Sequence, residues 1–315
     1  MVKKGRVKGI QAAAASALFL GISPIFGKIA ILFGFTPLAV VTFRTVIAFS
    51  LLLVLTFLLQ RQFFYIYPVG LAGCFLAGFF NGMGSILYYS ALSRLDASVG
   101  QLLYSLYPLF MAFWLLLDRQ TISRLTYFRL ALSLPGIFLL IYAGQNHVDW
   151  IGASLMIGSA LLYALHLLVN QRVLYEVPAP TVTLYTLLMM SITVTVAYFL
   201  FDHQLPAQGI PWWPLLALAI FTFASRVTLF QGVKHLGGMQ TALLGLGELV
   251  VTVLLAHFWL GENLSPIQWI GAGILVASLL LIGIDRLPPE KRHKSGWLAW
   301  LNPPQVNPTD IAWRS

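Results

Sequence analysis

Ten apolar stretches follow one another along the chain, and each is long enough to cross a lipid bilayer as a helix. A membrane helix needs about 20 predominantly apolar residues. The stretches are residues 10–33, 37–59, 68–93, 97–117, 126–143, 151–172, 179–201, 211–233, 238–260 and 266–284. Their near-continuous apolarity favours helices, because the strands of membrane barrels alternate over about ten residues. The sequence therefore predicts an all-α polytopic membrane protein with ten transmembrane helices.

The composition excludes several other classes of protein. Hydrophobic residues make up 59% of the chain and charged residues only 9%, whereas a soluble domain carries about 25% charged residues. These figures exclude a water-soluble enzyme and a disordered chain. Cys74 is the one cysteine, so the chain is not a disulfide-stapled secreted domain.

The positive charge of the chain gathers on one side of the predicted membrane. With the N-terminus inside, fifteen of the 19 lysines and arginines lie on the inner side, three lie within spans and Arg94 alone lies outside. By the positive-inside rule we expect both termini in the cytoplasm, in a multi-pass protein of a prokaryotic cell membrane. The net charge of +9 then implies contact with anionic membrane lipids and no nucleic-acid partner. The basic start also fits a signal peptide, but the apolar run after it exceeds the usual length of about 7–15 residues.

The two halves of the chain resemble each other weakly. Residues 16–22 are similar to residues 159–165, and the same or a similar offset aligns Pro37 with Pro180, Lys28 with Gln171, and residues 88–108 with residues 229–249. Each half has five spans, so the second half must enter the membrane from the opposite side, a plan that recurs in secondary transporters. The predicted parts are a basic cytoplasmic N-terminus (1–9), two inverted five-helix repeats (10–143 and 151–284) and a cytoplasmic tail (285–315).

Short motifs in a characteristic order carry a resemblance to a known family. They are Gly21, Ser23 and Lys28 in the first span, Pro37 and Arg44 in the second, Tyr104 to Phe110 in the fourth, and Leu260 to Glu262 with Gly271 at the end of the second repeat. From about residue 10 to 285 the chain resembles the drug/metabolite transporter superfamily, of the EamA-domain type with two five-helix EamA repeats. This resemblance implies transport of a small organic solute. In the superfamily such solutes include amino acids, nucleotide sugars, phosphorylated sugars and drugs.

Three positions depart from the family pattern. Leu20 stands where the family has tryptophan. Leu249 stands where the ninth span has proline, although the preceding acid, Glu248, is retained. The kink expected at Pro108 in the fourth span therefore need not have a symmetric counterpart. The first repeat ends in residues 117–119, Leu-Asp-Arg, rather than in Leu-Gly-Glu.

Charged side chains inside the spans are the first candidates for a site, because they are costly in a membrane. Lys28 and Arg44 flank the turn at residues 34–35, at depths of roughly 10–13 Å for a rise of about 1.5 Å per residue. The two cations form either an outer vestibule that attracts an anionic solute, or side chains that reach the membrane surface and nearby helix ends.

Arg226 and Glu248 form the second charged pair. They lie about ten residues before and after the turn at residues 237–238, so an antiparallel hairpin places them about 15 Å from the inner end. The pair is either an ion pair or a site where Glu248 exchanges protons or binds an amino group while Arg226 tunes it.

Uncharged polar side chains extend the candidate site. His166 and Asn170 share a helix face at i, i+4 and contact either the solute or a neighbouring helix. Asn81, Ser85 and Tyr88 share a face of the third span, as do Gln101, Tyr104 and Pro108 on the fourth. The candidate solute-binding residues are Lys28, Arg44, Asn81, Tyr88, Tyr104, Tyr107, His166, Asn170, Arg226 and Glu248, with Pro108 as the gating kink. The histidines show no metal-ligand spacing, and we expect no metal and no cofactor apart from coupling to H+.

The sequence thus favours a secondary transporter, not an enzyme. Three cations against Glu248 within the spans favour an amino acid, organic acid or related metabolite, moved by alternating access, with export as one option. The alternative is a multidrug or cationic-compound efflux carrier. An intramembrane enzyme needs paired acids or a histidine cluster, and a channel builds its pore by oligomeric symmetry. Monomer and homodimer are both compatible with the sequence, and in the tail Trp297, Leu298, Trp300 and Leu301 are expected on the inner leaflet.

Overall fold

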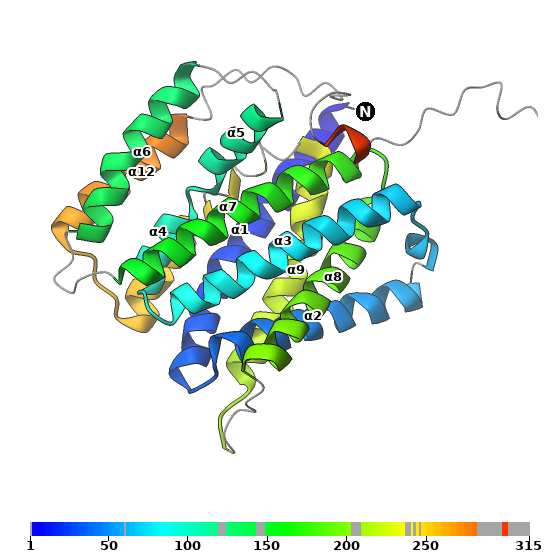
Figure 1. Cartoon of the computed structure of the whole chain (residues 1–315), viewed down its shortest axis with the longest axis horizontal. Coiled ribbons are helices and arrows are strands. Elements are labelled where there is room, and N and C mark those ends of the chain that lie inside the picture. The colour runs from blue at the N-terminus through cyan, green and yellow to red at the C-terminus, as the bar shows by residue number, and fades with distance from the viewer. Residues whose placement is uncertain are drawn as a thin grey trace, which may run out of the picture.

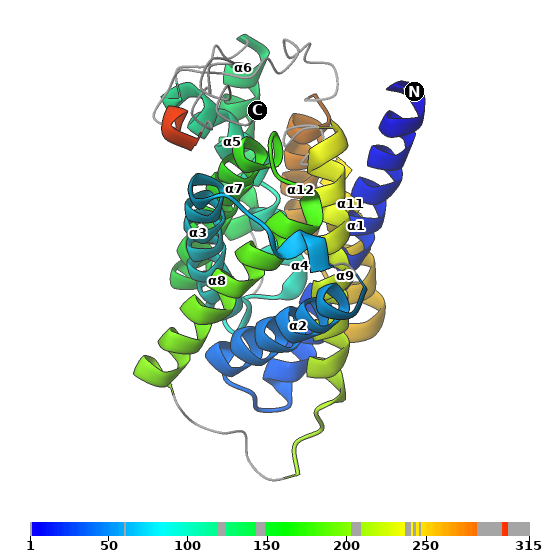
Figure 2. The same cartoon turned by 90° about the vertical axis from the view of Figure 1, so that its right-hand side faces the viewer.

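The protein is an all-helical bundle over the part of the chain that is described. The computed structural model describes residues 2–59, 61–118, 124–142, 149–202, 209–236, 241, 244–245, 247–281 and 298–301. In these residues the elements are α1 (Val2–Leu32), α2 (Pro37–Leu59), η1 (Arg61–Phe64), α3 (Pro68–Leu92), α4 (Ala97–Tyr104), α5 (Tyr107–Leu117), α6 (Arg124–Tyr142), α7 (Trp150–Leu174), α8 (Ala179–Phe201), α9 (Trp213–Leu236), α11 (Gly247–Leu255), η2 (Ala256–Leu260), α12 (Pro266–Leu280) and η4 (Ala299–Leu301). Figures 1 and 2 show their arrangement. The predicted all-α fold is confirmed.

The helices have the length and surface of membrane spans. Within the described residues, seven segments are long and apolar enough to cross a bilayer, namely those of α1, α2, α3, α4 with α5, α7, α8 and α9. Residues 247–260 and 266–278 form shorter apolar helices. Large apolar side chains such as Leu58, Leu200 and Phe201 are exposed on the outside, whereas Thr45, Ser105 and Asn170 are fully buried. This inside-out polarity suits a lipid environment. The chain is a multi-pass membrane protein.

Proline and glycine set the ends of the helices. Gly34 has a φ of 101° in the turn after α1, a backbone conformation that costs glycine little. The chain then enters α2 at Pro37, where the Thr36 hydroxyl accepts a hydrogen bond from the N–H of Ala39 at 3.1 Å. α3 likewise begins at a proline, Pro68, because proline lacks only an N–H that the first turn leaves unpaired anyway.

The fourth span is broken where the sequence has its proline. α4 ends at Tyr104 and α5 begins at Tyr107. Pro108 has no N–H to donate, so the carbonyl of Tyr104 loses its α-helical partner. Close to this break, the hydroxyl of Ser105 donates to the carbonyl of Leu102 at 2.6 Å. In the ninth span α11 passes directly into the π-helical turn η2, and residues 237–240, 242–243 and 246 lie outside the described part of the chain.

The packing of the helices follows the inverted repeat. One repeat is mapped onto the other when corresponding helices are exchanged: α1 with α7, α2 with α8, α3 with α9, α5 with α11 and α6 with α12. Under this exchange the α1–α9 contact becomes the α7–α3 contact, and the α1–α11 contact becomes the α7–α5 contact. The α2–α8 and α6–α12 contacts map onto themselves, and the α6–α12 pair stands at one side of the bundle (Figure 1). The prediction of two inverted five-helix repeats is confirmed.

The bundle has an N-terminal end and a loop end. At the N-terminal end α1, α3 and α8 begin and α2, α5, α7 and α9 finish, while the loop end carries the turn after α1 and the segment after η2 (Figure 2). Leu298 and Leu301 of the tail are 0% and 2% exposed and pack at the N-terminal end, not on the leaflet surface as expected. Gly73 of α3 leaves room for the Leu301 side chain, because a Cβ atom at this position would lie only 2.8 Å from Leu301 Cδ2. Trp300 is exposed, and Trp297 lies outside the described residues.

A first prediction concerns the close approach of α3 and α8 at Gly78. A Cβ atom there would lie 2.5 Å from the backbone oxygen of Thr186 and 2.7 Å from Met189 Cβ. Overpacking of this kind costs about 1–3 kcal/mol, so Gly78→Ala should lower the thermal midpoint of the purified protein by several degrees. Gly273→Ala in α12 is the matched control, because a Cβ there meets nothing within 4 Å. Equal midpoints for the two variants would contradict the packing described.

Candidate solute-binding site

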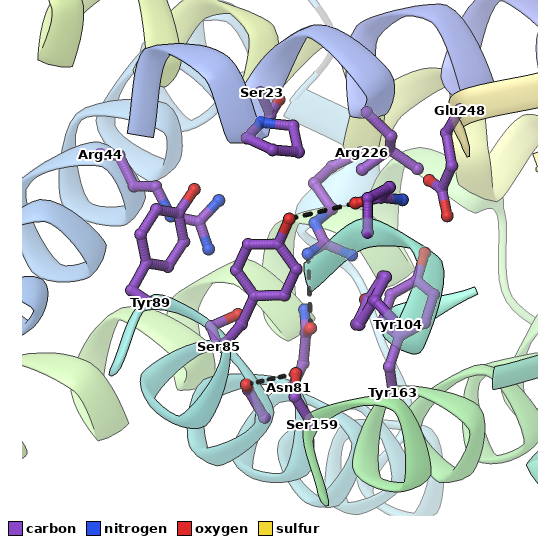
Figure 3. Close-up of a pocket in the computed structure, with 15 residues that line it drawn as sticks. Ser23, Arg44, Asn81, Ser85, Tyr89, Tyr104, Ser159, Tyr163, Arg226 and Glu248 are labelled. Carbon is purple, nitrogen blue, oxygen red and sulfur yellow. Dashed lines mark hydrogen bonds between the residues drawn. The ribbon is translucent and has the colours of Figure 1, made fainter. Parts of the chain in front are cut away.

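A small polar cavity lies at the middle of the bundle, between the two repeats. Its volume is about 50 Å³, enough for a few water molecules at about 10–15 Å³ each. The walls come from α1, α2, α3 and α4 of the first repeat and α7, α9 and α11 of the second (Figure 3). The lining residues are Leu20, Ser23, Pro24, Arg44, Asn81, Gly84, Ser85, Tyr88, Tyr89, Gln101, Tyr104, Ser159, Tyr163, Arg226 and Glu248. Six predicted solute-binding residues are among them: Arg44, Asn81, Tyr88, Tyr104, Arg226 and Glu248.

Arg226 reaches into the cavity from α9. Its Nη2 donates a hydrogen bond to Oδ1 of Asn81 on α3 at 3.3 Å, and its guanidinium carbon lies 5.8 Å from the centre of the Tyr163 ring. The side chain is buried, yet Nε and Nη1 have no hydrogen-bond partner. Unmet buried donors are costly, and a planar guanidinium is well suited to bind a carboxylate. Arg226 is therefore the cation best placed to receive an anionic group.

Glu248 faces the same cavity from the first turn of α11. It is 2% exposed, and its Oε1 atom accepts no hydrogen bond. Gln101 of α4 lies within hydrogen-bonding reach of the carboxyl group. The ion pair with Arg226, one of the two alternatives, is not found among the described residues, in which Nη2 of Arg226 donates to Asn81. Arg226 and Glu248 thus face one cavity, and each has at least one buried polar atom without a hydrogen-bond partner (Figure 3).

Arg44 supplies a second cation on the other side of the cavity. Its Nη1 donates to the Thr222 hydroxyl of α9 at 3.2 Å, and its guanidinium lies 4.6 Å from the centre of the Tyr89 ring. Nε has no partner. A cation over an aromatic face is stabilised by about 0.5–2 kcal/mol. Arg44 is therefore held more closely by an aromatic ring than Arg226, whose guanidinium carbon lies 5.8 Å from the centre of the Tyr163 ring.

Tyrosines of α3, α4 and α7 form part of the cavity wall. The ring of Tyr104 lies 5.0 Å from Tyr88 and 5.3 Å from Tyr163, centre to centre. The Tyr88 hydroxyl donates to Oε1 of Gln101 at 3.1 Å. Tyr107 packs behind this wall, 5.1 Å from the Tyr163 ring, and does not line the cavity. The rings offer an apolar or aromatic solute a stacking surface.

His166 and Asn170 lie behind the cavity in a network of their own. His166 is fully buried, and its Nδ1 donates to the carbonyl of Ala77 at 3.0 Å. The Asn170 amide lies 3.0 Å from Nδ1 and 3.4 Å from Nε2 of His166, and its Oδ1 accepts from the Thr186 hydroxyl at 3.1 Å. This network joins α7 to α3 and α8. Of the two interpretations left open above, it matches the interhelical hydrogen bond.

Lys28 does not share a vestibule with Arg44. Its Nζ donates to the carbonyls of Leu92 and Leu95 at 2.8 and 2.6 Å. Leu92 is the last residue of α3 and Leu95 follows it, where backbone carbonyls have no intrahelical partner. The long side chain reaches this helix end and not the cavity. Of the two alternatives for Lys28, this placement matches the side chain that reaches a nearby helix end and not the vestibule.

Several cavity residues were missed in the sequence. Ser159 and Tyr163 precede His166 on α7 at the spacing i, i+4, i+7, and this shared face was a usable signal. Pro24 lies inside α1 and lines the cavity beside Leu20. Because proline has no N–H, the carbonyl of Leu20 loses its intrahelical partner at the cavity wall. The shared polar face of α7 was visible in the sequence. In contrast, nothing in the sequence alone predicts that Pro24 lies at the cavity wall.

A cavity lined by two inverted repeats of apolar helices defines the class: a multi-pass membrane protein with a central candidate site. The EamA-like transporter family matches residues 7–142 and residues 150–284, one match in each repeat. The chain belongs to the EamA-like transporter family.

Individual relatives agree with this assignment. An uncharacterized transporter from Synechocystis sp. is 29% identical over 231 residues, which are 71% of this chain and 69% of the relative. The uncharacterized transporter YcbK from Bacillus subtilis is 25% identical over 203 residues, 61% of this chain and 65% of YcbK. A solved crystal structure with 16% identity superposes with a TM-score of 0.62, covering 90% of this chain and 97% of its own, and shows the shared fold alone. The relatives support a membrane transporter.

Proposed function

We propose that the protein is a secondary transporter, not an enzyme, and that it moves a small organic solute across the membrane by alternating access between its two repeats. One observation carries the proposal: residues of both repeats enclose a polar cavity in which Arg226 and Glu248 keep unpartnered polar atoms. Such groups are expensive to bury unless a ligand completes them in part of the cycle. Inverted-repeat transporters hold their solute at this kind of central interface.

The charges in the cavity favour a solute with a carboxylate. Arg44 and Arg226 face a single acid, Glu248, across the lining. A carboxylate placed between the arginines would use their unmet N–H groups, and an amino group would lie toward Glu248. Tyr88 and Tyr104 would contact an apolar part of the solute. An amino acid, an organic acid or a related metabolite meets these requirements, with coupling to H+ through Glu248.

The size of the cavity supports an occluded intermediate. Its volume of about 50 Å³ is far below the roughly 300–1,000 Å³ of a pocket that holds a small ligand. Solute would enter only when the repeats move apart at one end. The proposed setting is a prokaryotic plasma membrane with both termini in the cytoplasm, so the N-terminal end of the bundle would open to the cytoplasm.

Counterflow tests the transport proposal directly. Proteoliposomes preloaded with one of a panel of amino acids, organic acids and sugar phosphates should show faster uptake of the same labelled solute. Such trans-stimulation is expected of a carrier, whereas a channel or an enzyme does not give it. A matching solute should also raise the thermal midpoint of the purified protein, since a ligand present at 100 times its Kd stabilises by about 2.7 kcal/mol.

A cation carrier is the second candidate, and the tyrosine wall around Glu248 favours it. Aromatic faces and one carboxylate can hold an organic cation. Thermal stabilisation by cationic compounds alone, with no response to carboxylates, would replace the first proposal with this one.

A further inference from the structure

At the loop end, Glu262 of the second repeat binds the first turn of α4 in the first repeat. Its carboxylate accepts hydrogen bonds at 2.8 Å from the backbone N–H of Ala97, the backbone N–H of Ser98 and the Ser98 hydroxyl. Lys28 of α1 donates to the carbonyl of Leu95, just before α4, at 2.6 Å. We call Glu262, Ala97, Ser98 and Lys28 the Glu262 cluster. In it the segment after η2 binds the first turn of α4 in the other repeat.

At the N-terminal end, Asp118 of the first repeat binds the second repeat. It follows α5 and forms an ion pair with Arg172 of α7, and their side chains are 0% and 3% exposed. The backbone N–H of Leu298 in the tail donates to Oδ1 of Asp118 at 3.5 Å. We call Asp118, Arg172 and Leu298 the Asp118 cluster.

The internal repeat relates the two clusters. Residues 117–119 occupy the place in the first repeat that residues 260–262 occupy in the second, and Lys28 aligns with Gln171, the neighbour of Arg172. In each cluster an acid that follows the fourth span of one repeat binds the other repeat, and a cation of that other repeat's first span belongs to the same cluster. Because the repeats are inverted, the two clusters lie at opposite ends of the bundle.

We propose that these clusters are the two latches of the transport cycle: the Glu262 cluster holds the loop end closed, and the Asp118 cluster holds the N-terminal end closed. This inference rests on the proposed alternating access. Both latches are engaged in the structure, in which the cavity is small. Each opens in turn as the repeats separate at its end.

The chemistry of the latches suits a reversible closure. A buried ion pair gains little net stability, because desolvation offsets most of the attraction. When the N-terminal end opens, water can solvate Asp118 and Arg172 separately, so the lost contact is largely replaced. The same holds at the loop end for Glu262 and the N–H groups of Ala97 and Ser98. Apolar contacts would instead expose surface that water does not compensate.

Thiol labelling from each side of the membrane tests the proposal. Cys74→Ala removes the native cysteine, and Ser23→Cys places a reporter in the cavity wall. Right-side-out and inside-out vesicles are treated with a membrane-impermeant maleimide. Glu262→Gln should raise the labelling rate from the loop end at least threefold and lower it from the N-terminal end. Asp118→Asn should do the reverse.

Matched variants keep the test decisive. Arg94→Gln is the control, since it breaks an exposed ion pair with Asp149 at the loop end (2.8 Å) that belongs to neither cluster. It should leave the labelling ratio unchanged. If Asp118→Asn does not fold, Asp118→Asn with Arg172→Gln removes both buried charges together. Ser98→Ala, which deletes one of the three bonds to Glu262, should give a smaller shift toward the loop end.

The outcomes separate the latches from the proposed function. Opposite shifts from the two ends support the latches, and the readout requires no known solute. Folded variants whose labelling does not change, or changes in the same direction, overturn the proposal even if counterflow succeeds. Failure of counterflow for every solute would count against the proposed function while leaving an opposite labelling shift in place.

Discussion

Replacement of Glu248 by glutamine should abolish the response of transport to a pH gradient. The amide keeps the shape of the side chain but exchanges no proton. Oε1 of Glu248 faces the cavity without a partner, so a proton can be taken up or released there as solute leaves or enters. One pH unit supplies about 1.4 kcal/mol per coupled proton, which corresponds to about tenfold solute accumulation. Uptake into proteoliposomes under imposed pH gradients measures this, and the variant should only equilibrate its solute.

Two controls accompany this experiment. Glu176→Gln removes an exposed carboxylate at the N-terminal end of the bundle and should respond to the gradient as the unmodified protein does. Counterflow without a gradient should survive in Glu248→Gln, which shows that the variant folds and binds. Persistent gradient-driven accumulation in that variant would remove Glu248 as the coupling site.

The membrane helices could be predicted because apolarity over about 20 residues leaves a chain few other structures. The first and last residues of a helix were harder to predict where the sequence has no proline or glycine to break the helix. The first span was predicted to start at residue 10, but α1 begins at Val2. Hydropathy reports where a helix leaves the bilayer, and lysine and arginine are good helix formers that continue it into water. At Pro37 and Pro68, in contrast, the predicted and observed starts coincide.

The depth of a charged residue was easier to predict than its partner. Arg226 and Glu248 were expected at one level, and both line the cavity. Their partners depend on how α9 and α11 are rotated against α3 and α4, and spacing along one chain segment does not contain that information. Arg226 therefore donates to Asn81 and not to Glu248. For Lys28 the sequence left a vestibule and a helix end as alternatives, because spacing does not show which way a flexible side chain turns; the side chain reaches a helix end.

Replacement of Arg226 by glutamine should weaken the binding of a carboxylate solute by about 10–100-fold. A hydrogen bond to a charged group contributes about 1.5–3 kcal/mol, and 1.4 kcal/mol corresponds to a factor of ten in Kd. Arg226 has two buried donor atoms without a partner, and Arg44 is held more closely by an aromatic ring, 4.6 Å from the centre of Tyr89. Arg44→Gln should therefore have the smaller effect. Calorimetric titration of the purified protein with the solute identified by counterflow gives both values of Kd.

The methyl ester of the same solute shows whether Arg226 acts on the carboxylate itself. Esterification should weaken binding to the unmodified protein but have little further effect in Arg226→Gln, because the interacting partner is already missing. Arg61→Gln, in which an exposed arginine bonded to the Phe57 carbonyl is lost, controls for the change in net charge and should retain full sensitivity to the ester. An ester that binds the unmodified protein as tightly as the free acid does would exclude a carboxylate at Arg226. The positive charges in the cavity would then have to be accounted for by Glu248 alone, without a solute carboxylate.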